Sequence, residues 1–208
     1  MNTTQMKAHI ANGGIDARLT YIYGEAAVAA QKARYSAAID EFAAIYGADR
    51  EITLYSVAGR SELSGNHTDH NYGRVIAASL DLDIIAIASP ADSSTIRVYS
   101  EGFGEQKVDF EAYSTPDEAK FGTSESIIAG MCAGFKKNGH KVGGFDAYAT
   151  SNVLKGSGMS SSAAYEDMIG NISFLPLIVA AACMIAFGMS FAFPKVISHM
   201  GKERVTEA

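Results

Sequence analysis

Residues 156–164 read GSGMSSSAA, a glycine- and serine-rich stretch that runs directly into alanines. Glycines let an anion come close to the backbone, and the alanines after the serines predict that a helix begins here. Backbone N–H groups at the start of a helix, together with the helix dipole, favour a bound phosphate. The stretch therefore predicts a phosphate-binding loop that leads into a helix. A plain Ser/Gly linker before a helix is the alternative.

The residues before this loop predict both helices and strands. Residues 24–46 are alanine-rich and carry apolar side chains at three- and four-residue spacing, which is typical of an amphipathic helix that ends at Gly47. Residues 125–138 predict a second helix, which Gly139 stops. Strands are predicted at 51–58, 75–89 (as one or two strands), 95–100 and 144–153, with a turn over 90–94. Interleaved strands and helices indicate an α+β or α/β fold.

The composition argues against several classes of function. The net charge is −6 and the basic residues are scattered, so a nucleic-acid partner has no electrostatic support. Cys132 and Cys183 lack the spacing of a metal or redox site, which predicts free thiols in a reducing compartment. The first residues contain no apolar run of the signal-peptide kind, and we therefore expect a cytoplasmic protein.

The chain changes character near its end. Residues 168–194 contain no charged side chain, and residues 174–193 are almost wholly apolar. Such a run is long enough to cross a bilayer, which takes about 20 residues. Lys195 follows it, so the positive-inside rule would place the preceding domain outside the cell, where a nucleotide site has little use. A membrane partner is therefore disfavoured. A buried helix and a tail foreign to the original fold are the other two alternatives.

A second polar constellation follows the first predicted strand. Residues 59–73 read GRSELSGNHTDHNYG. Asp, Asn and His side chains donate and accept hydrogen bonds in fixed directions, which suits a sugar, and the carboxylate of Asp69 can accept from two adjacent hydroxyls. Arg60 can offset negative charge on a transferring phosphoryl group. Zinc binding by His67 and His70 is a weaker alternative because no third ligand is apparent. A polar surface turn is the other alternative.

Together the two segments resemble a known family. Residues 59–83, GRSELSGNHTDHNYGRVIAASLDLD, resemble the sugar-binding signature of galactokinases. Residues 156–166, GSGMSSSAAYE, resemble the phosphate loop shared by galacto-, homoserine, mevalonate and phosphomevalonate kinases. A homoserine or mevalonate kinase is the alternative, but it leaves the NHTD motif unexplained. The resemblance spans residues 18–170 and implies an α+β fold, a two-layer mixed sheet with the phosphate-loop helix against it.

The resemblance implies a role for each matching residue. Arg60 matches the arginine that assists phosphoryl transfer, Ser162 the serine that reaches Mg²⁺, and Ser100 a further nucleotide contact. The galactose-binding positions fall on Asn66, His67, Thr68 and Asp69. The ATP phosphate loop falls on Gly156, Ser157, Gly158, Met159, Ser160, Ser161 and Ser162. Asn66 stands where the family has glutamate, so it keeps an acceptor but loses the charge.

The activity that the resemblance implies is ATP-dependent phosphorylation of galactose at its anomeric hydroxyl, with Mg²⁺. The family's Cys-Gly-x-x-Asp-Gln motif, whose Asp acts as the catalytic base, is absent from this sequence. We therefore expect residues 1–170 to be the N-terminal domain of a galactokinase and residues 171–208 to be an apolar helical tail foreign to the family, from a frame shift or as a membrane segment. This predicts little or no kinase activity. A non-catalytic galactose- and ATP-binding module and a membrane-anchored fragment are the alternatives.

Overall fold

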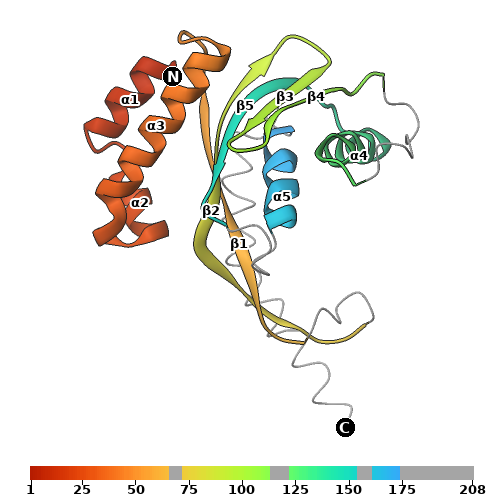
Figure 1. The fold of residues 1–208 in the computed structure, drawn as a ribbon, viewed down its shortest axis with the longest axis horizontal. Helices are drawn as coiled ribbons and strands as arrows, with labels where there is room; N and C mark the ends of the chain where they lie inside the picture. Colours follow the sequence, from red (N-terminus) through yellow and green to blue (C-terminus); the bar gives the residue numbers. More distant parts are fainter. Residues whose placement is uncertain (66–71, 113–121, 154–160, 174–208) are drawn as a thin grey trace. The chain divides into compact units, whose positions relative to one another are not determined.

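A five-stranded sheet organises the computed structural model, which describes residues 1–65, 72–112, 122–153 and 161–173 (Figure 1). The elements are α1 (Thr3–Ala11), α2 (Asp16–Tyr23), the 3₁₀ turn η1 (Glu25–Ala27), α3 (Val28–Tyr46), β1 (Thr53–Ser64), β2 (Ile76–Ala91), β3 (Thr95–Ser100), β4 (Gly104–Asp109), α4 (Ser124–Lys137), β5 (Gly144–Ser151) and α5 (Ser161–Ser173).

The sheet is mixed. Its strand order is β1-β2-β5-β3-β4. The β1–β2, β2–β5 and β3–β4 pairs are antiparallel, whereas β3 and β5 run parallel. Helix α4 lies between β4 and β5 in the chain, as the crossover into a parallel strand requires. The predicted α+β class with a mixed sheet is confirmed.

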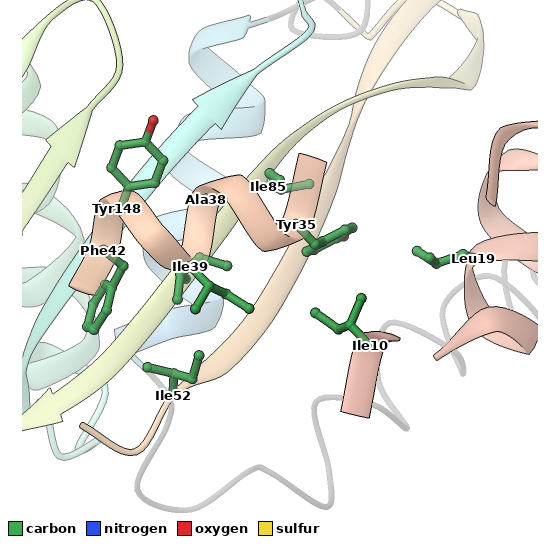
Figure 2. Packing of buried hydrophobic residues seen from close by; sticks show 10 residues of the cluster. Ile10, Leu19, Tyr35, Ala38, Ile39, Phe42, Ile52, Ile85 and Tyr148 are labelled. Carbon is green, nitrogen blue, oxygen red and sulfur yellow. The ribbon is translucent and has the colours of Figure 1, made fainter. Parts of the chain in front are cut away.

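Helices cover both faces of the sheet. On one face, α3 packs on β2 and β5, and α1 and α2 pack on α3. Figure 2 shows the apolar cluster of this face, in which Ile39 and Phe42 of α3 lie near Ile85 and Tyr148 of the sheet. Side chains alternate between the two faces along a strand. The buried side chains of Ile84 and Ala86, next to Ile85, therefore point to the other face of the sheet. There α5 packs on β1, β2 and β5, and α4 packs on β4 and α5.

Several helix ends follow from local sequence. Helix α3 ends at Gly47, whose φ of 102° is a conformation that favours glycine, as the sequence predicts. Helix α1, which the sequence analysis does not predict, has only a sparse apolar pattern. A capping box stabilises it: the Asn2 side chain accepts from the Gln5 N–H at 2.9 Å, and the Asn2 N–H donates to Gln5 Oε1 at 3.1 Å. Its Ile10 is fully buried in the apolar cluster that includes Ile39 and Phe42 of α3, so tertiary packing also stabilises the helix.

The main differences from the predicted strands concern β1, β2 and β4. Strand β1 continues to Ser64, so the first residues of the polar constellation are part of the sheet. Strand β2 is a single strand that includes Pro90 and Ala91, which the sequence assigns to a turn. Its pairing with β5 extends to Ala91, opposite Gly144. Strand β4 was not predicted, because GEQKVD has little β propensity and its buried polar residue breaks the apolar alternation.

The predicted boundary between domain and tail at residues 170 and 171 stays a prediction. Helix α5 runs through it to Ser173, and its Ile172 is buried. The apolar run 174–193 lies outside the described residues, as does the rest of the predicted tail. Within the residues that the structure describes, none of the helices has the length and apolar character needed to cross a membrane.

Candidate functional site

A strand precedes the predicted phosphate loop and a helix follows it, as such loops require. Strand β5 ends at Ser151, and α5 begins at Ser161. The start of the connection is fixed to the sheet, because the Asn152 N–H donates to the Asp83 carbonyl oxygen at 3.0 Å. The Ser151 hydroxyl also accepts from the Val153 N–H at 3.0 Å. The predicted phosphate-binding residues Gly156, Ser157, Gly158, Met159 and Ser160 lie outside the described residues.

The first turn of α5 carries both hydroxyl and backbone N–H donors. Ser161 is half-buried, Ser162 is exposed, and the turn carries no acidic side chain. The first N–H groups of a helix have no partner within the helix, and they lie at its positive end. The two hydroxyls add further donors. This arrangement suits an anionic ligand such as a triphosphate.

Ser100 lies beside the same helix, on the β3–β4 hairpin. Its hydroxyl donates to Gln106 Oε1 at 3.0 Å, and the Tyr165 hydroxyl of α5 donates to the same oxygen at 3.5 Å. Gln106 is buried, and its Nε2 donates to the Gly104 carbonyl oxygen at 2.9 Å. Burial raises the pKa of Tyr165 to about 12. The structure therefore brings Ser100 to the phosphate-loop helix through Gln106, a residue that the sequence analysis did not single out.

Arg60 lies on β1, the strand that leads into the sugar signature. It is exposed and pairs with Ser79 of β2, just after a register shift between Ala58 and Arg60. Register shifts occur at β-bulges and other irregularities, and bulges are common beside functional sites. Arg60 forms no ion pair or hydrogen bond to another described residue. Because α5 packs on β1, the strand of Arg60 is a direct neighbour of the phosphate-loop helix.

Gly65 marks the point where the sugar signature leaves the sheet. Its φ is 119°, and a Cβ there would lie 2.6 Å from the Arg74 carbonyl oxygen and 2.7 Å from the Val75 Cα. Only glycine fits this close approach of the two arms of the hairpin. The predicted galactose-binding residues Asn66, His67, Thr68 and Asp69 lie outside the described residues, as do the two histidines of the zinc alternative.

A buried carboxylate that the sequence analysis did not single out connects the two segments. Asp83 of β2 accepts hydrogen bonds from Arg34 Nη1 at 2.6 Å, from Ser56 Oγ at 2.5 Å and from the Tyr23 hydroxyl. Burial, the neighbouring Tyr35 and the hydrogen bond to Asp83 raise the pKa of Tyr23. Ser56 is on the strand that leads to the sugar signature, and the Asp83 carbonyl holds the start of the phosphate loop. In the sequence, this role could have been recognised from Asp83 as a charged residue within a predicted apolar strand.

Comparisons with known proteins agree with the sugar signature. Residues 40–90 match the family model described as the galactokinase galactose-binding signature. The galactokinase of Ligilactobacillus salivarius (strain UCC118) is 33% identical over 138 residues, which cover 64% of this chain and 35% of that protein. The galactokinase of Lactococcus lactis subsp. lactis (strain IL1403) is 29% identical over 139 residues, which cover 65% of this chain and 34% of that protein.

Comparison with solved structures also indicates similarity to galactokinases. The crystal structure of Lactococcus lactis galactokinase complexed with galactose matches with a TM-score of 0.62 at 28% sequence identity, over 70% of this chain and 38% of that one. The chain thus spans about a third of the length of the relatives that it matches. The N-terminal part of this chain is therefore related to galactokinases in both sequence and fold.

Proposed function

We propose that this chain carries the galactose- and ATP-binding part of a galactokinase site. The observation that supports this most is the packing of α5 on β1. The helix begins within the phosphate-loop motif, and the strand leads into the sugar signature. Two motifs far apart in the sequence are thereby attached to neighbouring elements, which is what the transfer of a phosphoryl group between two bound substrates needs.

The described residues suggest how ATP is held. The positive end of α5 faces the triphosphate, and the Ser161 and Ser162 hydroxyls donate to its oxygens. The exposed Ser162 hydroxyl fits Mg²⁺, which takes one or two protein oxygens and fills its other positions with phosphate and water. Ser100 contributes from the β3–β4 hairpin. A cytoplasmic location is part of this proposal, because the cytoplasm supplies ATP.

The sugar is assigned to the segment after Gly65. Asp69 accepts from two hydroxyls of galactose, with Asn66, His67 and Thr68 as further partners. The anomeric hydroxyl oxygen forms a bond to the γ-phosphorus of ATP, the bond from that phosphorus to the β–γ bridging oxygen breaks to release ADP, and the hydroxyl proton passes to water. Arg60 offsets the negative charge on the phosphoryl group during this transfer.

The proposed activity of the chain itself is low. The loss of a general base lowers the rate by a factor on the order of 10²–10⁴, and the sequence lacks the family's Cys-Gly-x-x-Asp-Gln motif. A module that binds galactose and ATP without turnover is the second candidate, and the same missing motif favours it. Steady ADP release with galactose at high protein concentration would exclude that second candidate.

Calorimetric titration of galactose and of Mg-ATP tests the binding assignment. We expect Asp69→Ala to weaken galactose binding and Ser161→Ala to weaken Mg-ATP binding, each without loss of the other ligand. Asp49→Ala removes an exposed carboxylate elsewhere, and Ser124→Ala removes the serine that begins α4, so these two variants are matched controls. Unchanged affinities in Asp69→Ala and Ser161→Ala would refute the assignment.

A further inference from the structure

A second buried carboxylate, Asp146 of β5, lies on the α3 face of the sheet and is shared by two arginines. Its Oδ2 accepts from Arg50 Nη1 at 2.7 Å and from Arg97 Nη2 at 2.8 Å, and its Oδ1 accepts from Arg97 Nε at 2.6 Å. The Asp146 side chain is 2% exposed. Two guanidinium charges against one carboxylate leave a positive charge in excess.

The two arginines differ in whether all three guanidinium nitrogens donate a hydrogen bond to a described residue. Arg50 also donates to the Ser89 hydroxyl at 3.2 Å and to the Pro90 carbonyl at 2.9 Å, so all three of its nitrogens are engaged. Arg97 lies 5.0 Å from the centre of the Tyr46 ring, and its Nη1 has no hydrogen bond to any described residue. Asp146 and Tyr46 thus fix the guanidinium of Arg97 while leaving one nitrogen to donate.

A shallow, open cavity of about 230 Å³ has Arg97 in its lining. Its lining consists of Ala91, Ser93, Thr95, Arg97, Lys107 and Asp146. Lys107 of β4 is directly opposite Arg97 in the β3–β4 register, is exposed, and forms no ion pair among the residues described. Like charges directly opposite each other destabilise a strand pair, and an anion between them removes that repulsion. The size is below the roughly 300–1,000 Å³ of pockets for drug-sized ligands.

Of the acidic side chains nearby, Asp146 lines the cavity. The charge of Asp146 is already neutralised by both arginines. Glu105 accepts from the Tyr46 hydroxyl at 3.4 Å, and Asp109 accepts from the Glu111 N–H at 3.1 Å. Neither Glu105 nor Asp109 lines the cavity. Arg97 and Lys107 are thus the two cations that line this small space. The hydrogen bond to Asp146 and, to a lesser degree, the charge of Glu105 raise the pKa of Arg97, and Glu105 lies outside the lining.

We propose that this cavity, the Arg97–Lys107 pocket, binds a small phosphate-class oxyanion, either inorganic phosphate or the phosphate group of a phosphomonoester. Arg97 donates from a fixed guanidinium, Lys107 adds a mobile point charge, and the Thr95 hydroxyl is a further donor. Asp146 is the positioning residue that holds Arg97. The pocket is on the opposite face of the sheet from α5, so this inference does not rest on the proposed kinase site.

An NMR titration of inorganic phosphate into the ¹⁵N-labelled full chain tests the pocket, with chloride added to keep the ionic strength constant. We expect saturable shifts of the amide signals of residues 95–97 and 106–108. Lys107→Ala should weaken this binding by roughly tenfold or more, the usual loss for a hydrogen bond to a charged group. Lys137→Ala removes the same charge from an exposed position at the end of α4 and is the matched control.

A parallel titration with glycerol 2-phosphate distinguishes the two sources of the anion. Tighter binding of the ester identifies a phosphomonoester as the ligand, and tighter binding of phosphate identifies the free ion. The proposal fails if neither probe gives saturable shifts at β3 and β4, if only residues 161–163 respond, or if the Lys107→Ala and Lys137→Ala variants bind equally well. If Lys107→Ala does not fold, Thr95→Val replaces it in the phosphate titration. This variant removes one proposed hydroxyl donor and should weaken phosphate binding.

Discussion

Asp83 and Asp146 are both buried on the α3 face of the sheet, but their charges are neutralised in different ways. Asp83 has one arginine and two hydroxyl donors, which come from α2, α3 and β1. Asp146 has two arginines and borders a cavity. The Asp83 cluster is balanced and connects four elements, whereas the Asp146 cluster has a surplus positive charge beside solvent. Asp83 thus links several helices and strands, whereas Asp146 positions an arginine of the proposed anion pocket.

The largest expected effect is that of Asp83→Ala. Removing this carboxylate leaves the largely buried Arg34 without its ion-pair partner, and loss of one member of such a pair lowers the free energy of unfolding by about 3–5 kcal/mol. Urea denaturation followed by circular dichroism measures the change. A loss below about 1 kcal/mol would mean that Asp83 behaves as a surface ion pair.

Asp146→Ala should have a smaller effect. The side chains of Arg50 and Arg97 are 27% and 39% exposed, so water solvates them once the carboxylate is gone. We expect the free energy of unfolding to fall by about 1–3 kcal/mol, less than for Asp83→Ala in the same urea titration. The reverse order would contradict the distinction between a closed cluster and an open one.

The tyrosines beside the two carboxylates offer a milder comparison. Tyr23→Phe removes a donor to buried Asp83 and should lower the free energy of unfolding by about 1–2 kcal/mol. Tyr46→Phe removes a donor to the exposed Glu105 and should change the same quantity by less than about 0.5 kcal/mol. Equal losses in thermal unfolding would show that the two hydroxyls are in equivalent environments.

The same two tyrosines predict a loss of stability at alkaline pH. Burial is the main cause that raises the pKa of both Tyr23 and Tyr46 above the ordinary 10.0. A raised folded-state pKa gives stability that is complete below pH 10.0 and is lost as the pH rises further. Thermal unfolding at pH 8 and at higher pH should show this decline, and Tyr23→Phe should make it shallower. A stability that rises above pH 10 would contradict it.

The smallest expected effect is that of Lys107→Ala in the absence of added anion. Removal of the charge opposite Arg97 relieves like-charge repulsion, so the free energy of unfolding should stay unchanged or rise by a few tenths of a kcal/mol. Thermal unfolding of this variant beside Lys137→Ala measures the difference. A clear loss of stability specific to Lys107→Ala would show that Lys107 has a structural partner rather than a free ammonium.

Local sequence determined the elements whose patterns are complete within a few turns. Helices α3 and α4 and strands β3 and β5 lie where apolar spacing predicts them, and α5 begins inside the serine run. For the candidate site, the sequence predicted that a strand and a helix flank the phosphate loop. It also identified the galactokinase relationship, because the two motifs are short and continuous.

Only the tertiary structure decided the parts that depend on distant partners. Strand β4 forms although its sequence is weak, because buried Gln106 finds donors on β3 and α5. Asp83 reaches Arg34, 49 residues away, and Asp146 reaches Arg50, 96 residues away. A charged residue in an apolar strand shows that a partner must exist, since a buried charge requires one. Which arginine supplies that partner, and whether a charge is left over, depends on how the strands and helices pack.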